Sequence, residues 1–311
     1  MKRHNALQSL GAVLAAGALT LSACGSSDPL DSDSGNSESG ASGDNQTIVV
    51  GSQDYYSNEI IAEIYAQALE DSGFTVDRQF RIGQREVYLP EIEAGEIDLF
   101  PEYSGPVLQY WEPETTARIS EDVYAALEEA TPEGLRALEQ SPATDQDSYV
   151  VTQDFASEWD LTTIADLGNV DTPLTLGANS EAESRPNGPT GLKETYGIDV
   201  GFTPIEDSGG PLTVKALNDG AIQLAIIYTA DPSIKQNDLV SLEDTEGLFL
   251  ASNVVPLASD NVNDAAAAVI NSVSAAMTPD DLISLNARSV DEQLSASAIA
   301  EDWLAEKNLN G

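Results

Sequence analysis

The sequence has almost no histidine and almost no cysteine. Its only histidine is His4 and its only cysteine is Cys24, in a chain of 311 residues. Beyond Cys24 the chain therefore cannot build Ser-His-Asp or Cys-His catalysis, a zinc site of imidazoles or thiolates, or a disulfide framework. Carboxylates are plentiful, so a hydrolase that uses carboxylates alone stays open as an alternative, but no pair of acids stands out from the acidic background.

Positive charge is also scarce. The chain has 13 Lys and Arg against 53 Asp and Glu, which gives a formal net charge of −40. Nucleic acid and anionic lipid headgroups would be repelled by such a chain, which argues against both as partners. The acidity is equally explained by solubility outside the cell, in a medium that could be saline, and it does not describe the ligand.

The start of the chain is typical of a processing segment. Lys2 and Arg3 precede an apolar run from Leu7 to Leu21, and small residues precede Cys24. The run is shorter than the roughly 20 residues of a spanning helix. The sequence therefore predicts a signal peptide over residues 1–23 and no retained membrane span.

Leu21 to Cys24 resembles a bacterial lipobox, which implies that Cys24 is lipidated and becomes the mature first residue. The expected location is the outer face of the cytoplasmic membrane, with the protein exported and lipid-anchored. An ordinary secretory signal with a chance cysteine is the alternative. Cleavage removes two basic and no acidic residues, so the mature charge is 11 − 53 = −42. Residues 24–45 are mostly Ser, Gly, Asp, Asn and Glu, which predicts a flexible tether.

Strand and helix patterns alternate at the start of the body, which runs from residue 46 to 311. The predicted elements are a strand at 47–51, a helix at 58–69 capped by Ser57, a strand at 74–82, a helix at 84–93 and a strand at 97–100. Pro101 is expected to end the last strand and to leave Tyr103 in a loop. Short connections between these elements predict a parallel sheet covered by helices.

The alternation starts again after a helical stretch at 121–140, in which Pro132 is expected to begin a second helix. Strands are predicted at 147–152, 174–177 and 222–228, and a return strand opens at 254. The carboxyl-terminal part reads as helices over 265–277, 280–285 and 291–307. Two α/β lobes with a cleft between them fit this order.

Tyr103 follows the strand at 97–100, and ligands of open α/β sheets sit beyond the carboxyl ends of strands. The stretch around it, GEIDLFPEYSG, resembles the GEIDLYPEYTG stretch of the substrate-binding proteins of osmoprotectant ABC importers, which capture glycine betaine, choline or carnitine. The resemblance runs from Thr47 to the carboxyl end.

This resemblance implies a two-lobed, periplasmic-binding-protein-like fold of type II, with the ligand cleft between the lobes. Lobe one is expected to comprise residues 46–148 and 254–311, and lobe two residues 149–253, with two crossing strands as a hinge. The implied protein is a monomer without a cofactor or a metal. It is not an enzyme, and it passes its ligand to an ABC permease in the membrane.

A quaternary ammonium ion has no hydrogen-bond donor, so it is bound by aromatic faces, and a carboxylate on the same ligand needs an arginine or backbone amides. By motif matching, the resemblance implies a cage of tyrosines, an arginine for the ligand carboxylate, and acidic residues beside them. The candidates matched in this way are Tyr103, Tyr149, Tyr228, Arg185, Asp147 and Glu86, and Tyr55 of the first loop is a further candidate for the cage. Tyr149 could equally be core packing, Arg185 a surface ion pair, and Glu86 a solvated or capping residue.

The sequence departs from the family pattern at two positions. Ser252 and Val214 stand where the family has aromatic residues. The box of rings is then incomplete, unless Tyr55 or Tyr56 completes it, and the ligand stays open. A sensor lipoprotein of the same architecture, binding another small polar ligand, is an alternative function.

Overall fold

The computed structural model describes residues 47–310. The expected signal peptide, Cys24 and the tether lie outside these residues. No helix within residues 47–310 is both long enough and apolar enough to cross a bilayer.

The first sheet has five strands in the spatial order β2-β1-β3-β10-β4. Their bounds are Val76–Gln79, Ile48–Gly51, Leu99–Tyr103, Val254–Ser259 and Leu135–Ala137. Strand β1 is parallel to β2 and β3, whereas β10 is antiparallel to β3 and β4. The predicted alternation of strands and helices is confirmed for β1 to β3. The sheet is nevertheless mixed, because β10 enters it from a distant part of the chain.

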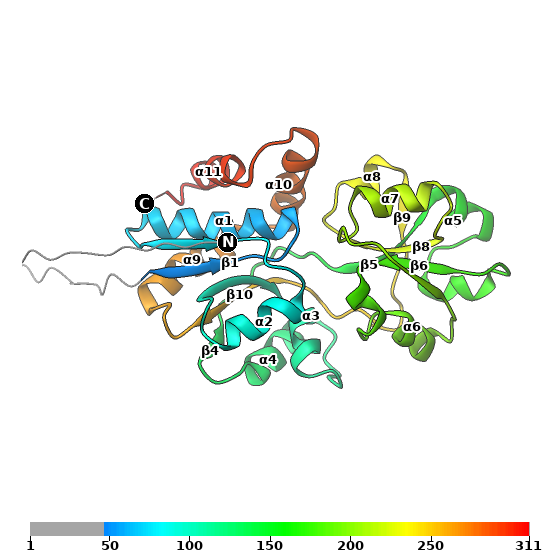
Figure 1. Cartoon of the computed structure of the whole chain (residues 1–311), viewed down its shortest axis with the longest axis horizontal. Helices are drawn as coiled ribbons and strands as arrows, with labels where there is room; N and C mark the ends of the chain where they lie inside the picture. Colours follow the sequence, from blue (N-terminus) through cyan, green and yellow to red (C-terminus); the bar gives the residue numbers. More distant parts are fainter. Residues whose placement is uncertain (1–46, 311) are drawn as a thin grey trace, which may run out of the picture. The chain divides into compact units, whose positions relative to one another are not determined.

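Helices cover both faces of this sheet (Figure 1). One apolar cluster joins the sheet to α1, α9, α10 and α11, and another joins it to α2, α3 and α4. These helices span Tyr56–Asp71, Asp264–Ala276, Pro279–Asp291, Ala296–Lys307, Arg85–Glu93, Ser104–Trp111 and Ser120–Ala130. We call this part of the chain lobe one.

The second sheet also has five strands, in the order β7-β6-β8-β5-β9. Their bounds are Gly201–Pro204, Thr175–Ala178, Leu224–Tyr228, Asp147–Thr152 and Leu239–Ser241. One face packs against α5 (Gln153–Trp159), α6 (Pro189–Tyr196) and the short 3-10 helices η1 (Ile164–Asn169) and η2 (Ser180–Glu183); the other packs against α7 (Pro211–Asn218) and α8 (Ser233–Gln236). We call this part lobe two. The prediction of two α/β lobes is confirmed.

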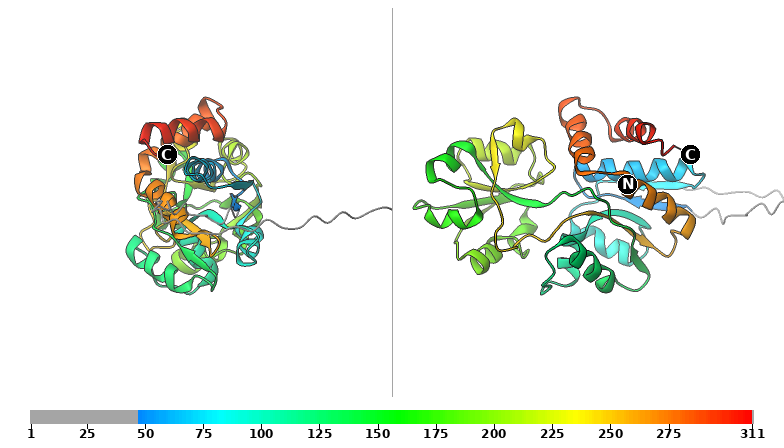
Figure 2. Two further views of the ribbon diagram at one scale, coloured as in Figure 1. Left: turned by 90° about the vertical axis from the view of Figure 1, so that its left-hand side faces the viewer. Right: turned by 180° about the vertical axis from the view of Figure 1, so that it is seen from behind.

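The chain crosses between the two sheets twice, before β5 and before β10, and the crossing segments lie side by side. Thr144 and Asn253 form an antiparallel bridge, and the Asp145 N–H donates to the Ser252 carbonyl at 3.0 Å. Figure 2 shows the green and the orange segments passing together between the sheets. The lobe boundaries expected from the sequence, at 148/149 and 253/254, fall close to these crossings and stay a prediction.

The prediction of a helix that begins at Pro132 is wrong. Helix α4 ends at Ala130, Gly134 has a φ of +88°, and the chain continues as strand β4. The partner of β4 is β10, in which Leu257 lies opposite Ala137. A pairing between segments more than a hundred residues apart overrides the local helical pattern, because the ladder satisfies backbone groups that local propensity does not count. Ser57 is not a cap either, since α1 begins at Tyr56.

Strand β3 does not stop at Pro101, as the sequence suggested, but continues to Tyr103. Pro101 lies opposite Pro256 of β10. The Pro101 carbonyl accepts a hydrogen bond from the Asn58 side chain at 2.7 Å, and the Pro256 carbonyl accepts from the Leu138 N–H at 2.8 Å. The carbonyl group of each proline therefore points away from the other proline. A missing N–H costs no ladder bond at such a pair.

The loop that carries Arg185 is closed by direct contact between backbone segments. A Cβ at Gly191 would lie 1.5 Å from the Pro186 carbonyl oxygen, and a Cβ at Gly188 would lie 1.8 Å from the Ala182 carbonyl oxygen. Only glycine permits this approach. The tight turn directs Arg185 and Asn187 from lobe two toward the cleft.

Gly191→Ala should therefore destabilise the fold by roughly 1–3 kcal/mol, as overpacking does, and should disturb the Arg185 loop. Gly168→Ala is the matched control, because a Cβ there would meet no atom within 4 Å. Thermal melting of both variants measures the difference. Equal melting temperatures would show that the loop relaxes without cost.

Candidate functional site

One cavity between the lobes collects side chains from both sheets. Strand β3 ends at Tyr103 and strand β8 ends at Tyr228, so both tyrosines lie at the carboxyl ends of their strands. Asp147 begins β5, and Tyr55 immediately precedes α1. The cavity is lined by Gln53, Tyr55, Arg85, Tyr103, Pro106, Asp145, Asp147, Arg185 and Tyr228. Five of the seven residues expected from the sequence are among them.

Three tyrosine rings meet in this cavity. The Tyr55 hydroxyl donates to the Tyr103 hydroxyl at 2.7 Å, and the Tyr55 and Tyr228 ring centroids are 5.2 Å apart at a tilt of 34°. Tyr55 and Tyr103 belong to lobe one, whereas Tyr228 belongs to lobe two. Burial raises the pKa of all three phenols, so they stay neutral at physiological pH. The rings offer uncharged, electron-rich faces from two sides of the cleft.

Arg85 is held by a carboxylate of its own lobe. Its guanidinium donates to both carboxylate oxygens of Glu102, at 2.7 and 3.0 Å. Glu102 is fully buried and also accepts from the Tyr88 hydroxyl at 2.5 Å and from the Tyr103 N–H at 2.6 Å. The buried pair is thus hydrogen-bonded on every side, as a buried charge requires. It fixes the backbone at Tyr103.

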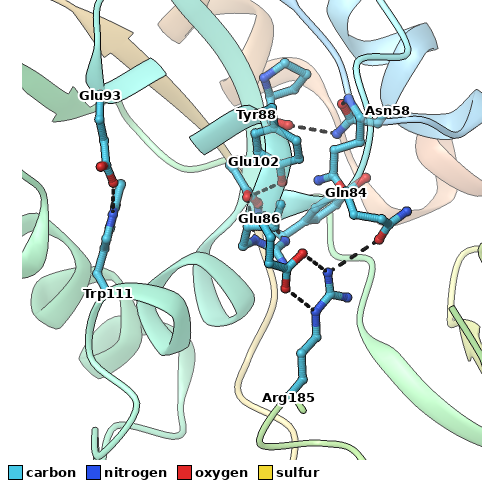
Figure 3. Close-up of polar contacts among 12 residues, drawn as sticks. Asn58, Gln84, Glu86, Tyr88, Glu93, Glu102, Trp111 and Arg185 are labelled. Atoms are coloured by element: carbon cyan, nitrogen blue, oxygen red, sulfur yellow. Dashed lines mark hydrogen bonds and ion pairs between the residues drawn. The ribbon is translucent and has the colours of Figure 1, made fainter. Parts of the chain in front are cut away.

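Arg185 is held by a carboxylate of the opposite lobe. Its guanidinium donates to both oxygens of Glu86 on α2, at 3.0 and 2.9 Å, and one nitrogen also reaches the Gln84 side chain at 3.4 Å. Figure 3 shows Glu86 and Gln84 pointing together at Arg185. Burial alone would raise the pKa of Glu86, yet the hydrogen bonds from Arg185 hold it below its ordinary value. Glu86 thus meets Arg185 with the two-pronged geometry that a ligand carboxylate would use.

Two further carboxylates line the cavity. Asp147 accepts a hydrogen bond from the Asn187 amide at 2.9 Å, and Asp145 accepts one from the Ala230 N–H at 2.8 Å. Burial raises the pKa of both groups, and that of Asp145 rises to about 8. Gln53 adds a donor, since its buried Nε2 has no hydrogen-bond partner among residues 47–310.

Tyr149 does not line the cavity. It is fully buried in the core of lobe two, packs edge-on against Phe249 at 5.0 Å, and donates its hydroxyl to the Asn187 carbonyl at 2.7 Å. Asn187 therefore contacts both Tyr149 and Asp147. The structure gives Tyr149 the packing role that the sequence left open as its alternative. Glu86 does not line the cavity either, but it borders the adjoining hollow through its pairing with Arg185.

Ser252 and Val214, which stand in place of the expected aromatic residues, both lie outside the lining of the cavity. Ser252 is buried in the second crossing segment, and its hydroxyl donates to the Asp145 carbonyl at 2.6 Å. Val214 packs in the apolar cluster under α7 and does not line the cavity. The space near Ser252 is thus occupied by the segment that carries Asp145.

The room left among these side chains is small. The free volume is about 20 Å³, enough for one water molecule. A neighbouring hollow of about 150 Å³ shares Arg85, Asp147 and Arg185 with the cavity. A trimethylammonium group is larger than the inner space, so its entry requires the walls to move apart.

Sequence reasoning missed Asp145, Arg85, Gln53 and Pro106. Asp145 could have been predicted, because it precedes Asp147 by two residues, and residues two apart on an extended chain face the same side. No local sequence pattern pointed to Arg85, since its partner Glu102 is 17 residues away.

A family model described as the substrate binding domain of ABC-type glycine betaine transport systems matches residues 46–306. The chain belongs to this family. Proteins of this family of substrate-binding domains are receptor components of transporters and not enzymes. The resemblance inferred from GEIDLFPEYSG is therefore confirmed.

Two curated relatives of this family of substrate-binding domains match along most of their length. Glycine betaine-binding protein YehZ of Escherichia coli (strain K12) is 24% identical over 275 residues, which cover 84% of this chain and 90% of YehZ. Carnitine transport binding protein OpuCC of Listeria monocytogenes serotype 1/2a (strain 10403S) is 24% identical over 270 residues, which cover 84% and 87%.

A crystal structure described as a glycine betaine/carnitine/choline ABC transporter has a TM-score of 0.68 to this chain at 19% identity, covering 85% of this chain and 100% of that one. This likeness concerns the fold. The architecture is that of the two-lobed, type II periplasmic binding proteins, as the sequence predicted.

Proposed function

We propose that this protein is the extracytoplasmic receptor of an ABC importer and that it captures a small quaternary ammonium compound between its lobes. The observation that carries the proposal is the meeting of Tyr55, Tyr103 and Tyr228 in one buried cavity beside Asp145 and Asp147. The protein acts as a monomer, without a cofactor and without catalysis, and delivers its ligand to a membrane permease.

The chemistry of the cavity suits a methylated cation. Aromatic faces attract a diffuse positive charge through the ring quadrupole and cover its methyl groups. Neutral phenols leave this attraction intact, and the carboxylates add to it. Gln53 supplies a donor for an oxygen at the other end of the ligand.

The pairing of the arginines favours a cation over a zwitterion. Arg85 is bound by Glu102 and Arg185 by Glu86, so both guanidiniums already hold a carboxylate. A ligand carboxylate would have to displace Glu86 from Arg185. Choline has a hydroxyl in that place and leaves the pair intact. We therefore expect choline to bind more tightly than glycine betaine or carnitine.

Capture follows from the placement of the contacts. Tyr55 and Tyr103 lie on lobe one, and Tyr228 and Arg185 on lobe two, so opening the hinge at Thr144 and Asn253 separates the two halves of the site. Closing them around a cation brings all the rings onto one ligand. The ligand stabilises the closed state by its contacts to both lobes.

Export and anchoring belong to the same proposal. A receptor of an importer must meet its ligand outside the cell and stay near the permease. The sequence Leu21 to Cys24 supports a lipid anchor on Cys24, and the polar residues up to 45 would give the receptor reach.

Tyr228→Ala should weaken choline binding by a factor on the order of ten or more, because a desolvated cation loses one ring face. Tyr228→Phe should retain most of the affinity, since the face matters more than the hydroxyl. Tyr124→Ala, which removes a ring from α4 outside the cavity and the adjoining hollow, is the control. Calorimetry with choline, glycine betaine and carnitine measures each case. Normal binding by Tyr228→Ala would remove the ring from the site.

Glu86→Gln should raise the affinity for glycine betaine relative to choline by about tenfold, because it frees hydrogen bonds to a charged guanidinium for the ligand carboxylate. Adding Arg185→Ala to the Glu86→Gln variant should abolish the gain in affinity for glycine betaine and leave choline binding nearly intact. Glu91→Gln, an exposed residue of the same helix, is the matched control. An unchanged ratio of the two affinities in Glu86→Gln would show that Arg185 does not select between these ligands.

Cys24→Ser should release the protein from membranes, because it removes the only thiol that a lipid could modify. Fractionation of cells that express the wild type and the variant measures the change. A variant that stays with the membranes as the wild type does would contradict the lipid anchor.

A further inference from the structure

Asp145 is fixed in the crossing segment from two directions. Its N–H donates to the Ser252 carbonyl at 3.0 Å, and its own carbonyl accepts from the Ser252 hydroxyl at 2.6 Å. One carboxylate oxygen, Oδ1, accepts from the Ala230 N–H at 2.8 Å, just beyond β8. The residue is only 4% exposed. The direction of its side chain is therefore set by the hinge and by the end of β8.

The carboxyl group of Asp145 faces the tyrosines. It lines the same cavity as Tyr55, Tyr103 and Tyr228, and its charge contributes to the raised pKa of each of these phenols. Ser252, where the family pattern has an aromatic ring, is the residue that holds Asp145 in place. Ser252 thus supports an acid that stands beside the tyrosines.

Asp145 lacks a cationic partner among residues 47–310. The two arginines of the cavity are engaged by Glu102 and Glu86, and both lower the pKa of Asp147. The acids that face Asp145 are Asp147 and Asp231, which both raise its pKa, and the other facing groups are the phenols of Tyr55, Tyr56, Tyr103 and Tyr228. Burial among these acids and phenols raises the pKa of Asp145 and so favours its neutral form, whereas a nearby cation would favour the carboxylate.

We propose that Asp145 is the countercharge of the bound cation, and that binding of a quaternary ammonium ion releases the Asp145 proton to the solvent. The inference rests on the proposed function, because it takes the tyrosine-lined cavity as the cation site. The step is balanced: the neutral carboxyl and the cation give a carboxylate–cation pair and one proton. The site pairs its ligand with a charge that is formed on binding.

The direction of the pH dependence follows from this exchange. In the free protein burial raises the pKa of Asp145 to about 8, so most molecules are protonated at pH 7 and must lose that proton when the cation binds. Affinity for choline should rise about tenfold per pH unit from pH 6 toward pH 8 and level off above it. At pH 7 about 0.9 proton should be released per choline bound.

The experiment is calorimetry of the full chain with choline chloride from pH 6 to pH 9, in buffers of different ionisation enthalpy. The wild type should show the rising affinity and the proton release. Asp145→Asn keeps the oxygen that accepts from Ala230 and removes the charge. It should bind at least tenfold more weakly at pH 9, with no proton release at pH 7.

Asp54→Asn is the matched control, because it removes the same charge from an exposed residue of the β1–α1 loop. It should behave as the wild type.

The unliganded proteins provide a second readout. Because the pKa of Asp145 is raised in the folded protein, this group contributes most to the free energy of unfolding below its unfolded pKa near 4. That contribution is lost as pH rises toward about 8. The melting temperature of Asp145→Asn should therefore gain on the wild type between pH 5 and pH 8.5.

The outcomes separate this role from the proposed function. Wild-type choline binding without pH dependence and without proton release overturns the role of Asp145 alone. The same holds if Asp145→Asn binds as tightly as the wild type at pH 9. Absence of binding for every quaternary ammonium compound at every pH overturns the proposed function and this role with it. If Asp145→Asn does not fold, the proton release of the wild type decides.

Discussion

Glu102 carries a charge that water cannot reach, and the arrangement of the cleft depends on how that charge is met. Arg85, Tyr88 and the Tyr103 N–H all donate to it. These bonds tie the start of α2 to the end of β3, and so they place the first ring of the cage. A buried charge is tolerated only with such complete hydrogen bonding, which makes this corner of lobe one rigid.

The same constraint shapes the rest of the cleft. Arg185 reaches across from lobe two and meets Glu86, so the second guanidinium is also engaged. Asp147 is held by the Asn187 amide, and Asp145 by a single backbone N–H. The pairing of both guanidiniums leaves these two carboxyl groups without an ion-pair partner among residues 47–310, beside three neutral phenols. The electrostatics thus favour a cationic ligand, and they do so through groups from both lobes.

The hinge and the site share residues. Ser252 binds Asp145 through both backbone groups of that residue, and Asp145 lines the cavity. A change in the relative position of the crossing segments therefore moves a wall of the binding site. Under the proposed function, this shared segment would let ligand contacts stabilise lobe closure, and lobe closure would in turn strengthen ligand binding.

Several features could be predicted from local sequence. The strand at 147–152 and the helix at 84–93 were correct to within a residue, because periodicity and end signals are local properties. The placement of Tyr228 at the end of its strand also followed from the pattern, whereas Tyr103, expected in a loop, belongs to strand β3. Strand β4 could not be predicted, because its partner β10 lies more than a hundred residues away. Pro101 inside β3 is acceptable only because it faces Pro256.

The sequence by itself determined the class of the protein, the two α/β lobes and the residue types available to the site. The absence of histidine and thiols in the body and the abundance of acids are fixed by composition. Only the tertiary structure decided which side chains meet. It buried Tyr149 behind Asn187, brought Tyr55 onto Tyr103, gave Arg185 to Glu86 and turned Asp145 into the cavity. These choices depend on contacts between segments far apart in the chain, and the cost of burying each charge depends on the partners that folding supplies.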